Sequence, residues 1–195
     1  MSSTQATDKE LIRRSKDGDK RAFDLLVLKY QYKVIGLVGR YVKDSHEAMD
    51  VSQEIFIKAY RALDNFRGAS QFYTWLYRIA INTAKNHLVA KARRPPDVDI
   101  APDDEGDYGQ ADVMADVDTP VNLLVRDQLQ EKVFATLERL PTDLKTALTL
   151  REFDGLSYGQ IAEVMNCPVG TVRSRIFRAR EAIDQEVERI LDRKS

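Results

Sequence analysis

The apolar residues of this chain recur at intervals of three and four positions, which is the spacing of amphipathic helices. Almost no segment alternates with the period of two that half-buried strands require. Over residues 20–42 one long apolar stripe consists of Phe23, Leu26, Val27, Tyr30, Val34, Leu37, Val38 and Tyr41. The same spacing predicts further helices at about 8–16, 46–63 and 71–92. The sequence therefore predicts an all-α fold.

A segment at residues 93–122 interrupts this helical pattern. It contains the adjacent prolines Pro95 and Pro96, and residues 97–118 hold nine acidic residues and no basic residue. A segment of this composition cannot bury enough apolar surface to offset its chain entropy, so it is predicted to be a flexible acidic linker. The linker separates a first small helical domain, residues 1–92, from a second, residues 123–195.

The second domain ends in a predicted helix-turn-helix. Its helices are expected at 123–140, between Pro141 and Gly155, and within Ser157–Glu181. Ser157 and Gln160 have the spacing of a capping box at the start of a helix. The buried stripe of that helix is predicted to consist of Ile161, Ala162 and Met165. A turn at residues 166–168 follows, and Pro168 suits the first position of a second helix.

The second helix of this motif has one apolar face and one basic face. Its apolar face consists of Val172, Ile176, Ala179 and Ile183. The residues left exposed are Arg173, Ser174, Arg175, Phe177, Arg178 and Arg180. A merely solvated helix mixes charges of both signs, whereas this face carries arginines alone. Arg can bind guanine through two hydrogen bonds, Ser can bond to phosphate or base, and Phe can contact the thymine methyl group, so the face predicts binding to duplex DNA.

A second candidate surface for nucleic acid lies on the helix at 71–92, which Ser70 is expected to cap. Arg78, Asn82 and Asn86 recur four residues apart, with Lys85 alongside them. Amides can bond to base edges, and cations neutralise phosphates. The aromatic residues that begin this helix could stack on unpaired bases, although core packing explains them better on their own. They are Phe72, Tyr73, Trp75 and Tyr77.

The helix at 46–63 carries Asp50, Gln53 and Glu54 close to Phe56 and Ile57. An acidic and apolar face cannot bind phosphate well. Two interpretations stay open at this point: the face is ordinary solvent-exposed surface, or it docks on a basic protein partner.

Charge and chemistry narrow the functional class. The net charge of −1 over 195 residues conceals a basic first part, where residues 1–96 carry 18 Lys and Arg against 10 Asp and Glu. The two histidines, His46 and His87, lie far apart, and neither a metal-ligand cluster nor a phosphate-binding glycine loop is present. The single cysteine, Cys167, is expected to be a small packing residue. We therefore expect no enzymatic activity, no cofactor and no metal site.

The remaining alternative is a conventional helix-turn-helix regulator. A receiver domain would show alternating strands and helices, which the first half of the chain lacks.

No run approaches the roughly 18 apolar residues of a membrane span, so the protein is expected to lie in the cytoplasm.

Two long segments resemble a known family. The stretch DVSQEIFIKAYRALDNFRGASQFYTWLYRIAINTAKNHL and, beyond the acidic segment, DGLSYGQIAEVMNCPVGTVRSRIFRARE are closely similar to extracytoplasmic-function sigma factors, specifically the envelope-stress sigma-E group. The resemblance covers residues 20–190 and implies a bacterial initiation factor that binds core RNA polymerase, directs it to promoters and helps to melt them.

The resemblance also implies roles for individual residues. Docking on the β′ clamp helices of the polymerase is implied for Asp50, Gln53, Glu54 and Phe56. Reading of the −10 element on the non-template strand is implied for Asn65, Arg67, Ser70, Phe72, Tyr73, Arg78, Asn82, Lys85 and Asn86. Reading of the −35 element is implied for Arg173, Ser174, Phe177 and Arg178, with Arg175 and Arg180 beside them. Further implied features are a contact with the β flap, a linker in the RNA exit channel, a monomeric state and an anti-sigma factor, often membrane-anchored.

Overall fold

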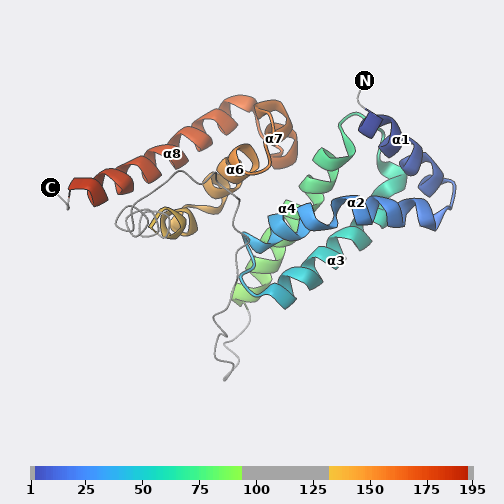
Figure 1. The fold of residues 1–195 in the computed structure, drawn as a ribbon, viewed down its shortest axis with the longest axis horizontal. Coiled ribbons are helices and arrows are strands. Elements are labelled where there is room, and N and C mark those ends of the chain that lie inside the picture. The colour runs from blue at the N-terminus through green and yellow to red at the C-terminus, as the bar shows by residue number, and fades with distance from the viewer. Residues whose placement is uncertain (1–2, 94–131, 193–195) are drawn as a thin grey trace, which may run out of the picture. The chain divides into compact units, whose positions relative to one another are not determined.

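The computed structural model describes residues 3–93 and 132–192 (Figure 1). Within those two ranges all regular secondary structure is helical, as the sequence predicted. The chain divides into two compact units, residues 1–108 and 109–195. No helix among the described residues is both long and apolar enough to cross a bilayer. The predicted linker, apart from Arg93, lies outside the described residues.

The first unit is a bundle of four α-helices with one short 3-10 turn. The elements are α1 (Ser3–Lys16), α2 (Lys20–Gly39), α3 (Ser45–Ala62), η1 (Leu63–Asn65) and α4 (Phe72–Arg93). Helix α1 begins five residues earlier than predicted, because its polar first turns carry no apolar stripe that would reveal them. Helix α2 packs against each of the other three helices.

Side-chain caps set the starts of α2 and α3. The carboxylate of Asp19 accepts hydrogen bonds from the backbone amides of Arg21 and Ala22 at 3.0 and 3.4 Å. Asp44 accepts one from the amide of Glu47 at 2.7 Å. Each cap satisfies a backbone donor that the first helical turn leaves without a partner. The chain between α1 and α2 turns through Gly18, whose φ of +94° favours glycine.

The apolar stripe of α2 forms the centre of the first core. Seven of its eight predicted members are buried, and Val27 is half-buried. An aromatic cluster extends this core toward the start of α4, with centroid distances of 5.9 Å between Phe66 and Phe72 and 5.1 Å between Phe66 and Trp75. Tyr30 adds a contact at 5.6 Å to Phe72. Core packing of Phe72, Trp75 and Tyr77 is therefore confirmed.

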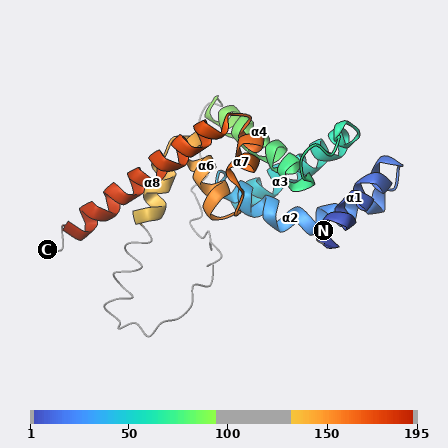
Figure 2. The same ribbon diagram turned by 90° about the horizontal axis from the view of Figure 1, so that it is seen from above.

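The second unit comprises a helical stretch at 132–139 and three further helices, α6 (Thr142–Glu152), α7 (Tyr158–Met165) and α8 (Val169–Asp192). The first half of the helix predicted at 123–140 lies outside the described residues. Both α6 and α7 pack against α8, which runs past them toward the C-terminus (Figure 2).

The capping box of the helix-turn-helix is confirmed in both directions. The amide of Ser157 donates to Oε1 of Gln160 at 2.8 Å, and the amide of Gln160 donates to Oγ of Ser157 at 3.3 Å. Helix α7 ends at Met165, and the cap residue after it, Asn166, has a left-handed φ of 50° and ψ of 52°. This conformation, which asparagine tolerates better than most residues, turns the chain toward α8.

Two details of the motif differ from the sequence prediction. Helix α8 begins at Val169, so Pro168 precedes it, and the Pro168 carbonyl accepts from the amides of Thr171 and Val172. In α7 the buried residues are Ile161 and Val164, whereas Ala162 and Met165 are half-buried. The prediction is confirmed for Ile161, but the i, i+3 pair Ile161 and Val164 forms the apolar face, and the prediction omitted Val164.

Candidate nucleic-acid interfaces

The first candidate interface is the exposed face of α8 at Arg173, Ser174, Phe177 and Arg178. The predicted buried residues Val172, Ile176 and Ala179 are at most 2% exposed, so this helix is fixed in rotation and presents the opposite face to solvent. Phe177 is 67% exposed. The ring is therefore available for contact with a ligand.

The polar side chains of this face are placed to contact a ligand. Within the described part of the chain Arg178 forms no ion pair, so its guanidinium is available. Arg173 lies 5.8 Å from the ring centroid of Tyr158, a cation–π contact that orients it without neutralising its charge. The hydroxyl of Ser174 donates to the Thr171 carbonyl at 3.0 Å, which leaves its oxygen free to accept.

Arg175 was predicted to belong to this face, and that prediction is wrong. Its Nη2 donates to Oδ2 of Asp143 on α6 at 2.7 Å, and its Nη1 donates to Sγ of Cys167 at 3.4 Å. The side chain is 23% exposed. Arg175 therefore ties the turn of the motif and α8 to α6, because its position on the helix points it toward that neighbour.

Arg180 is exposed as predicted, but it is paired. Its Nη2 lies 2.5 Å from Oε1 of Glu152. The hydrogen bond and charge of Glu152 raise the pKa of Arg180 above its ordinary value. A phosphate would have to compete with this carboxylate, so Arg180 is a weaker candidate than Arg178.

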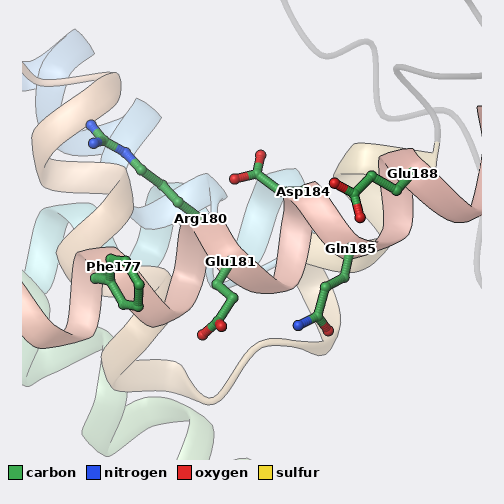
Figure 3. Close-up of a pocket in the computed structure, with 6 residues that line it drawn as sticks. All are labelled: Phe177, Arg180, Glu181, Asp184, Gln185 and Glu188. Carbon is green, nitrogen blue, oxygen red and sulfur yellow. The ribbon is translucent and has the colours of Figure 1, made fainter.

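The charge of α8 reverses after Arg180. A surface pocket on the helix is lined by Phe177, Arg180, Glu181, Asp184, Gln185 and Glu188. Figure 3 shows Arg180 and Asp184 along one edge of this stretch of the helix and Glu181 and Gln185 along the other. Three carboxylates within two turns repel phosphate, so the candidate DNA-binding half of α8 ends here.

The second candidate interface combines the loop at 63–71 with one face of α4. Asn65 and Arg67 are exposed in the loop, and Arg78, Asn82 and Asn86 are exposed on α4, as the sequence predicted. Lys85 is half-buried and has an interaction partner within the protein. Gly68, at a φ of +72°, forms the bend of the loop.

The predicted aromatic and capping residues of this interface need correction. Phe72 is 5% exposed within the aromatic cluster, so its ring cannot stack on a base in this conformation, and that prediction is wrong. Tyr73 is half-buried and lies 6.2 Å from the ring of Tyr77, edge to face. Helix α4 begins at Phe72, so Gln71 and not Ser70 immediately precedes it. Ser70 remains half-buried in the loop.

The third candidate surface lies on α3. Asp50, Gln53 and Glu54 are exposed, and Glu54 forms an ion pair with Lys58 at 2.7 Å. Phe56 is half-buried. Ile57, which the sequence placed beside these carboxylates, is exposed, and the face is more apolar than predicted because Met49 and Tyr60 are exposed as well. Large apolar side chains beside carboxylates favour a protein partner over bare solvent.

Glu47 links α3 to the far end of α4. Its carboxylate lies 2.9 Å from Nε2 of His87 and 2.6 Å from Nζ of Lys91. Burial alone would raise the pKa of Glu47, but the hydrogen bond from Lys91, together with the neighbouring imidazole of His87, outweighs that effect and holds the pKa below its ordinary value. No group of His, Cys, Asp or Glu side chains among the described residues is arranged to hold a metal ion.

Lys16, in the last turn of α1, makes a contact that the sequence did not predict. Its Nζ donates to the backbone carbonyls of Phe66 at 2.6 Å and Asp64 at 3.2 Å. No local pattern reveals such a contact, because the acceptors are backbone atoms about fifty residues away.

Comparison with known proteins agrees with this architecture. Residues 26–94 match the family model for Sigma-70 region 2, and residues 130–183 match the model for Sigma-70, region 4. The RNA polymerase sigma-H factor of Pseudomonas aeruginosa is 62% identical over 96% of this chain and 97% of its own length. The ECF RNA polymerase sigma-E factor of Escherichia coli K12 is 56% identical over 98% of this chain and 100% of its own.

Solved structures share the fold. CnrH in complex with the cytosolic domain of CnrY is 25% identical, with a TM-score of 0.65 over 97% of this chain and 99% of that one. The sigma factor RpoE of Bartonella quintana, solved with the anti-sigma factor NepR, is 22% identical with a TM-score of 0.61, over 85% of this chain and 96% of that one.

Two helical units that match sigma regions 2 and 4, in that order, are the architecture of a sigma factor of bacterial RNA polymerase. The chain belongs to the extracytoplasmic-function sigma factors, the initiation factors that bind core polymerase and direct it to promoters.

Proposed function

We propose that this sigma factor reads the −35 element with the α8 face formed by Arg173, Ser174, Phe177 and Arg178. The observation that carries the proposal is a rotationally fixed helix whose exposed face has an arginine that forms no ion pair with the described residues, an available hydroxyl oxygen and a 67% exposed phenyl ring. These groups suit guanine, phosphate and the thymine methyl group. Arg175 stabilises the second unit through Asp143, and Arg180, which is paired with Glu152, contributes less to DNA binding than Arg178.

The loop at 63–71 and the exposed face of α4 bind the melted −10 element in this proposal. Asn82 and Asn86 lie one helical turn apart, so successive amides face the same side and can bond to successive base edges. Arg67 and Arg78 neutralise phosphates. Region 2 is assigned to residues 1–92 and region 4 to 123–195, with the acidic segment 93–122 between them.

The α3 surface docks on core polymerase in this proposal. Its exposed carboxylates complement a basic partner, while Met49 and Ile57 supply the apolar area that a stable contact requires. The docking role of Asp50, Gln53, Glu54 and Phe56 rests on this combination of charge and exposed apolar surface.

The proposal includes an inhibitory partner. CnrH, which shares the fold of this chain, was solved in complex with the cytosolic domain of CnrY. An anti-sigma factor, membrane-anchored through its own sequence, would hold this chain in the cytoplasm as an inactive monomer. The sigma-E names of its relatives support a place in the envelope-stress response.

Run-off transcription with purified core polymerase tests this function directly. We expect specific start sites from sigma-E-type promoters only when the protein and core are both present. A gel shift without core should show weak binding to duplex promoter DNA. Tight binding of the protein alone to a palindrome would support the conventional helix-turn-helix regulator instead.

A double substitution tests the −10 assignment. Opening a base-pair step costs about 1.4 kcal/mol in lost stacking, part of which captured bases return. Asn82→Ala with Asn86→Ala should therefore impair transcription from duplex promoters, and a pre-melted bubble should restore it only in part. Complete rescue by any bubble sequence would show that these residues open DNA without reading it.

Charge reversal tests the docking surface. Asp50→Lys or Glu54→Lys should weaken co-purification with core polymerase, because the carboxylates then repel a basic partner. Binding of the isolated −35 duplex, measured by fluorescence anisotropy, should stay unchanged. If both variants co-purify with core polymerase as well as the wild type does, α3 is not part of the polymerase interface.

A further inference from the structure

Lys16 fastens the loop at 63–71 to helix α1. Its ammonium group carries three donors, and two of them point at backbone carbonyls of that loop, those of Asp64 and Phe66. Charge-assisted hydrogen bonds of this kind are about twice as strong as neutral ones. The two carbonyls flank Asn65, so the contact fixes the backbone on both sides of an exposed residue of the candidate −10 interface.

Helix α1 is itself anchored at its other end. The carboxylate of Asp8 accepts hydrogen bonds from Nζ of Lys29 at 2.5 Å and from the hydroxyl of Tyr30 at 2.6 Å. Leu11 and Ile12 are buried in the bundle between these contacts and Lys16. Lys16 therefore extends from a fixed helix. That helix lies before residues 26–94, the part that matches the region 2 family model.

The loop is also held by the core. Phe66 is 8% exposed and packs between Phe72 and Trp75. The loop is thus fixed both by a buried ring and by the hydrogen bonds of Lys16. Asn65 and Arg67, which flank Phe66, remain exposed. A loop held in this way pays less conformational entropy when it binds a ligand.

We infer that Lys16 is a positioning residue for the reading of the −10 element, acting through the backbone of residues 64–66 and not by touching DNA itself. The inference rests on the proposed role of the loop. It adds to that role a part for α1, a helix outside the region 2 match.

The test compares Lys16→Met with Lys9→Met, a matched change at an exposed lysine of the same helix. Loss of hydrogen bonds from a charged donor should lower run-off transcription from a duplex promoter roughly three- to tenfold for Lys16→Met. Discrimination between the cognate −10 element and a base-substituted one should narrow. Hydrogen exchange of the amides at 63–71 should accelerate, whereas Lys9→Met should resemble the wild type in all three measurements.

Two further variants separate this inference from the function on which it rests. Lys16→Arg keeps donors within reach and should restore most of the discrimination. Asn65→Ala tests the loop itself, and if it leaves −10 discrimination intact, the proposed reading by the loop fails. If Asn65→Ala narrows discrimination while Lys16→Met matches Lys9→Met, the loop keeps its role and the positioning role of Lys16 is overturned.

Discussion

The two candidate DNA surfaces of this sigma factor are assembled in different ways. The α8 face draws all four of its residues from one helix between positions 173 and 178; the turn before the helix sets its start, and packing on α6 and α7 sets its rotation. The −10 surface joins a loop to a helix, and its loop is held by Lys16 and by the ring of Phe66. One surface therefore depends mainly on short-range structure, and the other on packing between distant segments.

This difference predicts how each surface fails. Damage to the core of the first unit should displace the loop and its exposed residues together. Loss of the α7 cap should lower the stability of the second unit but leave the side chains on the exposed face of α8 in the same arrangement. Substitutions that remove either a core contact of the first unit or a local contact of the second unit can separate these two outcomes.

The largest effect is expected from Phe66→Ala. Removing a buried phenyl ring typically costs about 3 to 5 kcal/mol of unfolding free energy. Trp75 is the only tryptophan of the chain, so its fluorescence during urea denaturation reports on the first unit. Tyr32→Ala is the control, since Tyr32 is 79% exposed and should change stability by less than about 0.5 kcal/mol. Equal effects of the two changes would contradict the anchoring of the loop by Phe66.

Arg178→Ala and Arg175→Ala separate DNA contact from scaffold within one helix. Arg178→Ala should cost about 1 to 3 kcal/mol in binding to the −35 duplex and relax the preference at one base pair, with stability unchanged. Arg175→Ala should lower the unfolding free energy of the second unit by about 1 kcal/mol, since it removes a partly exposed ion pair. Anisotropy titration and thermal unfolding of both variants measure the contrast. The assignment is wrong if Arg175→Ala proves the more damaging to base preference.

Ser157→Ala tests the local support of the helix-turn-helix. Loss of an N-cap typically costs about 1 kcal/mol. Ser157→Asp keeps an acceptor for the amide of Gln160 and should retain most of the stability. Hydrogen exchange of the first amides of α7 provides the measurement. Equal exchange in all three proteins would show that tertiary packing, and not the capping box, holds this helix.

The smallest effect concerns pH. Because the pKa of Glu47 lies below its ordinary value of 4.5 in the folded protein, its ion pair with Lys91 stabilises the fold fully above that pH. The contribution of this ion pair is lost as the pH falls through the lowered pKa. Glu47→Gln should therefore destabilise the first unit at pH 7 and less so at pH 3, as measured by urea denaturation. If Glu47→Gln lowers the unfolding free energy equally at pH 7 and pH 3, the ionisation of Glu47 does not contribute to the stability of the first unit.

The contrast between the surfaces also explains what the sequence could predict. Helical periodicity identified the buried face of α8 and hence the exposure of Arg173 and Arg178, because one helix determines both. It failed for Arg175, since its partner Asp143 lies 32 residues away on another helix. Aromatic character alone could not tell the buried Phe72 from a stacking residue. The contact of Lys16 could not be predicted, because its acceptors are backbone carbonyls that no side-chain pattern reveals.

The most direct test measures which promoter element each surface reads. Holoenzymes carrying Arg178→Ala, or Asn82→Ala with Asn86→Ala, would be assayed by run-off transcription on promoters with base changes in only the −35 or only the −10 element. The account predicts that the first variant loses discrimination at −35 alone and the second at −10 alone. Loss of −10 discrimination by Arg178→Ala, with −35 discrimination intact, would contradict it.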